Sequence, residues 1–317
     1  MMKNKYAWLV MLIATGAIWA CNKEDTDDDP ATPPATVPNN TVFDALIADN
    51  IANETQSFAA NNEWGGQIVA AHGTELNFYP GAFVHEDGTA VTGQVVISVV
   101  EVLTIGKMIR LNKQTVGNDN GTYRLLRSGG AVNITVTQAG ETLEVTPGGL
   151  QVNVPTIIGD ASMALFSGAE GTDGRMIWNP APAPVTVVPA YVDLFYAFSP
   201  DSLNWINCDY FYSYPDLTHI TATIPDGQST DSTTLWLAFP TQNMVVQMPH
   251  ISGQNYADPP SYSGVPVGYP AVVVGLRQSS GGYYSSFTNV TISANMNIPI
   301  TFSPTTLAQF EAAVDGI

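Results

Sequence analysis

Two acidic residues, Glu101 and Asp209, are the strongest candidates for carboxylate chemistry in this chain. Each lies beside apolar or aromatic sequence, where burial would raise a carboxyl pKa as general acid catalysis requires. A glycosidase needs two such groups close in space, and their separation along the chain does not exclude this. The alternative, which we favour, is that each acid caps backbone amides near a strand end.

The histidines and Cys208 supply no second catalytic or metal-binding pattern. The four histidines are His72, His85, His219 and His250. None has a partner at the i+4 spacing that places two ligands on one zinc ion, so we interpret them as surface residues. Apolar and aromatic neighbours favour a buried, inert Cys208 thiol. Gly168, Gly171 and Gly174 lack the spacing and the lysine of a phosphate loop. We therefore expect no catalytic, metal or cofactor site, and no enzyme.

The amino terminus predicts a covalent modification at Cys21. Lys3 and Lys5 precede an apolar run, Tyr6 to Ala20, which has the length of a signal-peptide core and is short for a membrane span. The run ends Ala-Ile-Trp-Ala-Cys, which resembles a lipobox. The resemblance implies that residues 1–20 are a lipoprotein signal peptide and that Cys21 carries the lipid. Several acyl chains on one cysteine anchor a protein to a membrane without any other residue.

The residues after the cysteine predict where the anchored protein lies. Lys23, Glu24 and Asp25 resemble the surface-export signal of Bacteroidota lipoproteins, which implies an outer-membrane lipoprotein exposed at the cell surface. The alternative is a solvated acidic spacer. Asp25, Asp27 and Asp29 lie at alternate positions, but they lack the glycine and glutamate of a calcium-binding EF-hand loop. Residues 21–40 are acidic and then rich in proline and threonine, which indicates an extended tether.

Composition indicates a folded, β-rich chain with an acidic surface. Of 317 residues, 45% are hydrophobic and 12% are charged, against roughly 25% charged in average soluble domains. The net charge of −18 argues against a nucleic-acid partner and against electrostatic docking on anionic lipid. With Cys21 lipidated, Cys208 has no partner for a disulfide, so stability has to come from apolar cores.

The hydrophobic pattern predicts two or three antiparallel β-sandwich domains in tandem, with a short helix at each end. Residues 41–55 have helical spacing of apolar side chains, and so does the extreme carboxyl terminus. Between them, apolar and polar residues alternate in short runs separated by glycine-containing turns, which is typical of antiparallel hairpins. We divide this part into residues 56–156, 157–232 and 233–317.

The first of these segments resembles a known interaction domain. The stretches Gly73 to Phe83 and Val91 to Glu101 are similar to the β-sandwich shared by zonula occludens proteins, netrin receptors and ankyrins. The later pieces Leu125 to Ile134 and Val152 to Pro155 resemble the version of this domain in Bacteroidota surface lipoproteins. The resemblance implies an interaction or spacer module and no catalysis.

The two later segments resemble the continuation of the same lipoproteins and a regulatory sandwich. Leu203 to Phe211 looks like their tryptophan-asparagine-aspartate motif, and residues 265–275 resemble transthyretin-like domains of carboxypeptidases. The middle segment is crowded with aromatic residues: Trp178, Trp205, Tyr210, Phe211, Tyr212 and Tyr214. We interpret these rings as inter-domain core; the alternative is an exposed platform for a glycan or a partner chain.

Two short motifs suggest glycosylation, and the whole pattern suggests a binding role. Asp201-Ser202-Leu203 and Asp231-Ser232-Thr233 resemble the O-glycosylation sites of exported Bacteroidota proteins, which would modify Ser202 and Ser232. We expect a non-catalytic, lipid-anchored binding or structural module of the cell envelope, with an extracellular protein or glycan as its partner. The alternatives are a surface hydrolase and a glycan-binding accessory subunit of an uptake system.

Overall fold

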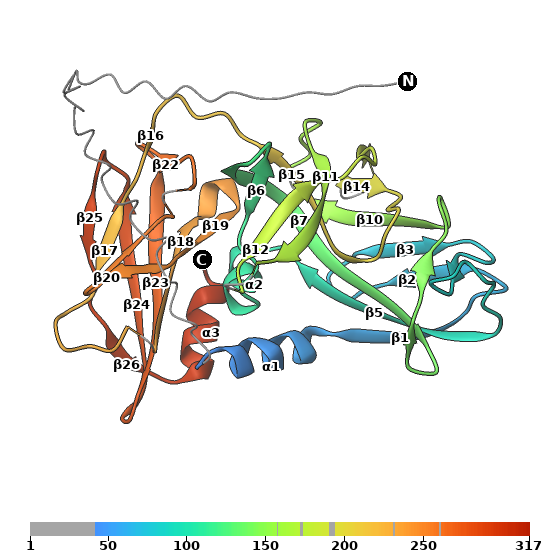
Figure 1. Cartoon of the computed structure of the whole chain (residues 1–317), viewed down its shortest axis with the longest axis horizontal. Helices are drawn as coiled ribbons and strands as arrows, with labels where there is room; N and C mark the ends of the chain where they lie inside the picture. The colour runs from blue at the N-terminus through green and yellow to red at the C-terminus, as the bar shows by residue number, and fades with distance from the viewer. Residues whose placement is uncertain (1–41, 157, 172–173, 190–193, 231, 260) are drawn as a thin grey trace, which may run out of the picture. The chain divides into compact units, whose positions relative to one another are not determined.

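Strands dominate the structure. The computed structural model describes residues 42–317 except 157, 172–173, 190–193, 231 and 260 (Figure 1). Strands account for 52% and helices for 11%, with one short helix at each end of the folded part, so the predicted all-β class is confirmed. No helix among these residues is long and apolar enough to cross a membrane. Cys21, Lys23, Glu24 and Asp25 lie outside the described residues.

Two sheets form the first sandwich. In order of pairing, the larger sheet contains β1 (Gln56–Asn61), β5 (Gln94–Val102), β7 (Thr122–Gln138), β15 (Asn204–Phe211), β11 (Ala164–Glu170), β12 (Met176–Pro180) and β6 (Val116–Asp119), with β8 (Glu141–Thr142) beside β7. The smaller sheet contains β13 (Thr186–Pro189), β14 (Leu194–Phe198), β10 (Leu150–Thr156), β3 (Glu75–Phe78) and β2 (Gly66–Val69). A further ladder joins β4 (Phe83–Val84) to β9 (Glu144–Val145). Alternate residues such as Ile97 and Leu76 fill the space between the sheets.

A β-bulge lets the long strand β7 serve two cores. Val132 and Ile134 point into the first sandwich, whereas Leu126, beyond the bulge, belongs to a different core. The register between β7 and β15 shifts at this point, and Gly130 has φ of +124°. A Cβ on the adjacent Gly129 would lie 2.4 Å from the Tyr196 ring, so only glycine fits there. Because of the extra residue, the alternation is reversed at the bulge: even-numbered residues face one side of the sheet before it and the other side after it.

The strands of residues 157–232 belong to both sandwiches. β11, β12 and β15 extend the larger sheet, and β6 pairs with both β7 and β12, which closes five strands into a ring. β13 and β14 extend the smaller sheet. The remaining strands, β16 (Leu217–Thr218) and β17 (Thr221–Thr223), pair with strands of the carboxyl-terminal sandwich.

The second sandwich is built mainly from residues 217–305. One sheet contains β19 (Met244–Met248), β18 (Thr233–Phe239), β23 (Pro270–Ser279), β24 (Gly282–Thr291) and β26 (Ser303–Thr305). The facing sheet contains β20 (His250–Ser252), β21 (Asn255–Ala257), β17 and β25 (Asn297–Pro299), while β22 (Val265–Pro266) pairs with β16 and the 3₁₀ helix η1 (Pro240–Gln242) follows β18. Buried residues such as Leu237, Phe239 and Val273 fill the core between these sheets.

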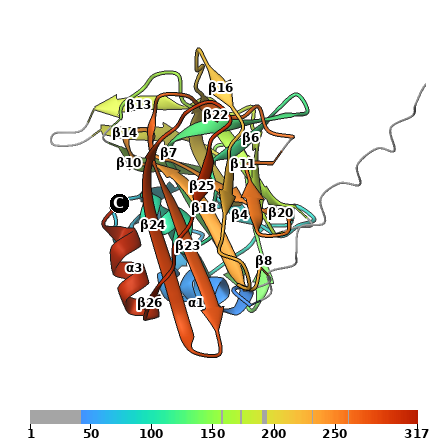
Figure 2. The same ribbon diagram turned by 90° about the vertical axis from the view of Figure 1, so that its left-hand side faces the viewer.

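A third core, which we call the seam core, joins the two sandwiches. Three helices border it: α1 (Asp44–Glu54), α2 (Ile105–Arg110) and α3 (Leu307–Asp315). Figure 2 shows α3 beside β24, where the Phe310 and Phe287 rings are 6.0 Å apart. The seam core comprises Phe43, Val100, Val102, Ile105, Met108, Ile109, Leu111, Leu126, Ala131, Phe166, Met176, Trp178, Trp236, Ala238, Val245, Val274, Leu276, Phe310 and Val314. Because it is continuous and apolar, it joins the two sandwiches far more firmly than a flexible linker would.

Candidate functional site

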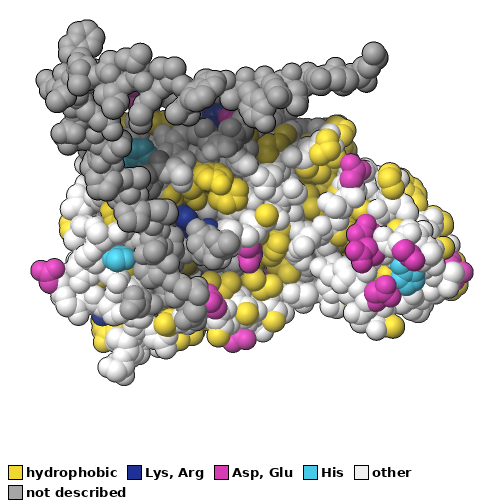
Figure 3. Space-filling model, in the orientation of Figure 1, with side chains coloured by type: hydrophobic (Ala, Val, Ile, Leu, Met, Phe, Trp, Pro, Cys, Tyr) yellow, Lys and Arg dark blue, Asp and Glu magenta, His cyan; other side chains and the backbone are white. Residues whose placement is uncertain are grey.

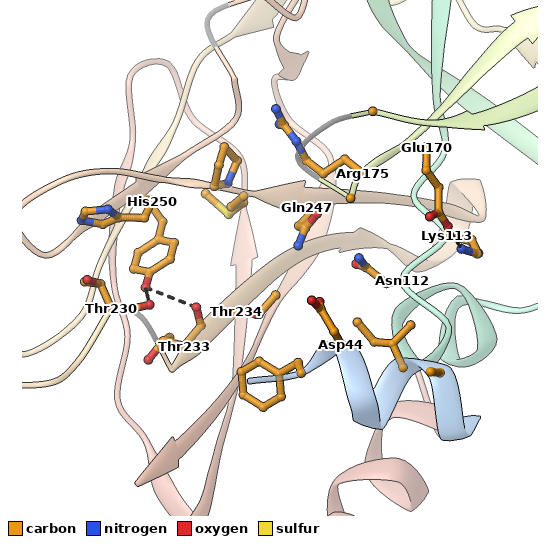
Figure 4. A pocket seen from close by; sticks show the side chains of 18 of the residues that line it. Asp44, Asn112, Lys113, Glu170, Arg175, Thr230, Thr233, Thr234, Gln247 and His250 are labelled. Atoms are coloured by element: carbon orange, nitrogen blue, oxygen red, sulfur yellow. Dashed lines mark hydrogen bonds and ion pairs between the residues drawn. The ribbon is translucent and has the colours of Figure 1, made fainter. Parts of the chain in front are cut away.

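A pocket opens at the seam between the two sandwiches, beside α1 (Figure 4). Its volume is about 450 Å³, within the range of small-molecule sites. The polar side chains that line it are Asp44, Asn112, Lys113, Glu170, Arg175, Thr230, Thr233, Thr234, Gln247 and His250. Apolar side chains such as Phe43, Ile47 and Met248 complete the wall. The pocket therefore combines polar and apolar walls, which suits a small amphipathic ligand.

Lys113 is the most deeply buried charge in the pocket wall. Its side chain is 3% exposed, and its ammonium group lies 2.5 Å from Oε1 of Glu170 and 4.7 Å from the centre of the Trp205 ring. Glu170 is 52% exposed, so water solvates one partner of the ion pair and not the other. The arrangement holds a positive charge over the Trp205 ring.

The remaining walls add further hydrogen-bonding groups, most of them neutral. The Tyr256 hydroxyl donates to the carbonyl of Thr230 at 3.1 Å, and the Asp44 side chain points into the pocket from α1 (Figure 4). Within the described part, Oε1 of Gln247 is buried and accepts no hydrogen bond. A ligand hydroxyl or amine would satisfy such an acceptor. The acids Asp44 and Glu170 balance the cations Lys113 and Arg175, which favours a neutral or zwitterionic ligand over a strongly charged one.

We expect unequal effects from removing the two partners of the Lys113–Glu170 pair. Lys113→Met should leave the free energy of unfolding unchanged or raise it by about 1 kcal/mol, because Glu170 stays hydrated. Glu170→Gln should lower it by about 2 kcal/mol, because Lys113 would remain buried without its counter-ion. Urea unfolding of both variants measures this difference. A large loss in Lys113→Met would instead identify Lys113 as a structural anchor and weaken the case for the pocket.

No sequence motif marks this pocket. Asp44, Lys113, Glu170 and Gln247 come from four separate segments, so no spacing connects them. The only available signal is scarcity, because the chain has ten lysines and arginines in 317 residues. Lys107, Arg110 and Lys113 are three of these ten cations, and the sequence does not show which of them lines a pocket.

Glu101 caps backbone amides, as its position near a strand end suggested. The side chain is 1% exposed and accepts hydrogen bonds from His72 N at 2.8 Å, Thr74 N at 2.9 Å and Gln56 Nε2 at 3.0 Å. These bonds fix the turn between β2 and β3 against β5. Both carboxylate oxygens are thus committed to the fold.

Asp209 is buried on the opposite face of the same sheet. On β15, Cys208 packs into the core of the first sandwich. Trp205 and Phe211 lie on the opposite face of the strand and pack against the seam core, and alternation places Asp209 on that same face. Glu101 lies on the face of β5 that carries Ile97 and Val99 into the first core. The two carboxylates therefore cannot act on one glycosidic bond, and a glycosidase built on this pair is excluded.

Burial strongly raises the pKa values of Asp209 and Cys208. Desolvation raises the pKa of the Asp209 carboxyl well above its usual range, although Ser128, Gly129 N and Asn207 donate to it. The Asn207 amide lies 2.5 Å from Oδ2 of Asp209. Burial also raises the pKa of the Cys208 thiol well above its usual range. This thiol is fully buried, so it lacks both the access and the thiolate form that a nucleophile needs.

The histidines lie apart from one another. His72 is exposed, and the other three each face a local partner: His85 lies 3.2 Å from Glu141, His219 lies 2.6 Å from the buried Asp258, and His250 contacts the Gly253 carbonyl. On the face shown in Figure 3, acidic side chains and a histidine gather at one end. Among the described residues, no group of three or more side chains has the geometry of a metal site.

The aromatic residues of the middle segment divide into core and surface. Trp178 is 1% exposed and donates to the Gln114 carbonyl, and Phe211 packs edge-on against Phe166. The partly exposed tyrosines form a row: Tyr210, Tyr212, Tyr214 and Tyr269. Successive rings are tilted by 57°, 48° and 90°, so they pack against one another and offer no common plane for a sugar to stack on.

The predicted glycosylation residues lie at the surface or at its edge. Ser202 is exposed in a bend before β15, and Ser232 is half-buried in the turn before β18. Asp231, the acidic residue of the second motif, lies outside the described residues. Both modifications stay predictions.

The fold and the site define an all-β protein of two sandwiches that share an apolar seam with a ligand-sized pocket. Comparison of the chain with protein-family models and with curated proteins found no match. The resemblances to lipoprotein and interaction domains therefore stay predictions from sequence.

Proposed function

We propose that this protein is a non-catalytic, lipid-anchored binding module of the cell envelope, displayed at the cell surface. The observation that carries the proposal is the seam pocket, which has the size and mixed lining of a ligand site. The Lys3 to Cys21 signal and the Lys23-Glu24-Asp25 sequence support the anchor and the surface address. Glu101 and Asp209, the acids best suited to catalysis by sequence, are used by the fold instead.

The experiment for the proposed address is protease shaving of intact cells. We expect peptides of the wild-type chain to be released by external protease, because lipid on Cys21 would hold the folded part at the cell surface. Cys21→Ala should instead appear unanchored in the soluble fraction, since no other feature of the sequence predicts membrane attachment. Mass spectrometry of the released and the cell-bound fractions measures both effects.

A second variant separates anchoring from display. In Glu24→Ala/Asp25→Ala the lipid anchor is retained while the predicted export signal is removed, so this protein should stay membrane-bound and resist shaving. If the wild type itself resists shaving until the outer membrane is broken, the protein faces the periplasm and the surface proposal is wrong.

A further inference from the structure

Three amide side chains form a row across the outer face of the smaller sheet of the first sandwich. Gln67 on β2 pairs in register with Asn77 on β3, and Asn77 pairs with Gln151 on β10. Their chain neighbours Ile68 and Leu76 are buried in the first core, so the amides point away from it. Strands lie about 4.8 Å apart, which gives a regular row of amide groups across three strands.

None of these three amide groups hydrogen-bonds to the described part of the protein. In the next row Nδ2 of Asn153 donates to Oε2 of Glu75 at 2.9 Å, so that pair satisfies itself. The side chains of Gln67, Asn77 and Gln151 make no such bond, and each carries two N–H donors and one carbonyl acceptor. Donors and acceptors are thus available to an outside partner.

Two exposed aromatic rings lie beside this row, toward the carboxyl end of β3. Tyr79 follows Asn77 by two residues and continues its face of the sheet, with 56% of the residue exposed. Trp64, in the turn before β2, is 78% exposed, the highest value among the exposed large hydrophobic residues of the described chain. Gly66 pairs with Phe78, which brings this turn beside Tyr79. Exposed aromatic rings next to polar groups mark interaction surfaces.

The chemistry of this surface selects among partners. Its side chains offer amide hydrogen bonds and ring faces, and neither a lysine nor an arginine lies in the amide row or beside the two rings. A net charge of −18 repels anionic polymers, and no cation here would offset that repulsion. Sugar hydroxyl groups can hydrogen-bond to the amides, and the C–H faces of sugar rings can stack on the exposed aromatic rings.

We propose that Gln67, Asn77, Gln151 and Tyr79, which we call the amide face, bind a neutral polysaccharide chain, with Trp64 at the rim. This surface is separate from the seam pocket, and its ligand binding does not depend on the lipid anchor. The proposal therefore stands or falls independently of the shaving experiment.

Affinity electrophoresis of the full chain carrying Cys21→Ala tests the amide face. Native gels would contain hydroxyethylcellulose, glycogen or arabinoxylan as neutral polymers, and polygalacturonate as the anionic one. We expect retardation by at least one neutral polymer and none by polygalacturonate. Tyr79→Ala and Gln67→Ala/Asn77→Ala should each weaken the retardation about fivefold, with unchanged melting temperatures because these side chains are exposed or half-exposed.

Asn289→Ala is the matched control, because this amide is exposed on β24 in the other sandwich and should not affect retardation. Absence of retardation by every neutral polymer would overturn the proposal, as would equal retardation of Tyr79→Ala and wild type. Light scattering distinguishes a second copy of the chain as the occupant. A dimer that Tyr79→Ala dissociates would show that the amide face is a self-interface, and the proposal would be wrong.

Discussion

Replacing Glu101 by leucine is expected to lower the free energy of unfolding by about 3–5 kcal/mol. The carboxylate accepts hydrogen bonds from His72 N, Thr74 N and Gln56 Nε2, and Thr74 is fully buried. Leucine would leave these donors without an acceptor, and a buried unsatisfied group costs about 1–3 kcal/mol. Urea unfolding followed by circular dichroism measures the loss.

Two further variants show whether the loss comes from the hydrogen bonds. Glu101→Gln keeps one oxygen acceptor and should lie between wild type and Glu101→Leu. Glu75→Gln is the matched control, because Glu75 is a half-buried acid on β3 of the smaller sheet with one amide partner. This variant should change stability by less than about 0.5 kcal/mol. A Glu101→Leu protein as stable as the control would show that the carboxylate does not hold the turn.

The free energy of unfolding of Asp209→Asn is expected to rise, relative to that of wild type, as the pH rises above about 4. The folded protein keeps Asp209 protonated because burial raises its pKa, while the unfolded chain ionises near pH 3.9. The stability that this group contributes is therefore complete below about pH 4 and is lost as the pH rises toward the folded pKa. The difference between the two proteins should grow by about 1.4 kcal/mol per pH unit in that window.

The pH dependence of this effect separates Asp209 from an acid whose pKa is lowered by folding. Hydrogen bonding to Ser162 lowers the pKa of the half-buried Asp160, so the stability that this carboxyl contributes is lost only below about pH 4. The difference between Asp160→Asn and wild type should therefore stay constant above that pH. Urea unfolding at several pH values below 7.5 measures both variants and keeps Cys208 un-ionised. A pH-independent difference for Asp209→Asn would mean that the buried carboxyl ionises at its usual pKa.

The sequence by itself determined the fold class and the helices at the two ends. Apolar spacing places a helix within residues 41–55, and the structure has α1 at Asp44–Glu54. Alternation at Val95, Ile97 and Val99 identifies a half-buried strand, and all three side chains lie in the first core. These features depend on local periodicity, which can be read from a short stretch of sequence without knowing its partners in the fold. The position of Glu101 near a strand end suggested capping, but its partners lie 27 to 45 residues away and only the structure identifies them.

Only the tertiary structure decided which strands pair and what they bring together. β15 lies beside β7 although more than 60 residues separate them, and the bulge at Gly130 sets which face each residue of β7 presents. That register puts Glu101 and Asp209 on opposite faces, and the same packing assembles the seam pocket from α1, Lys113, Glu170 and β19. Alternation tells which side of a strand is buried, but it does not identify the strand that covers it, because many partners satisfy the same apolar face.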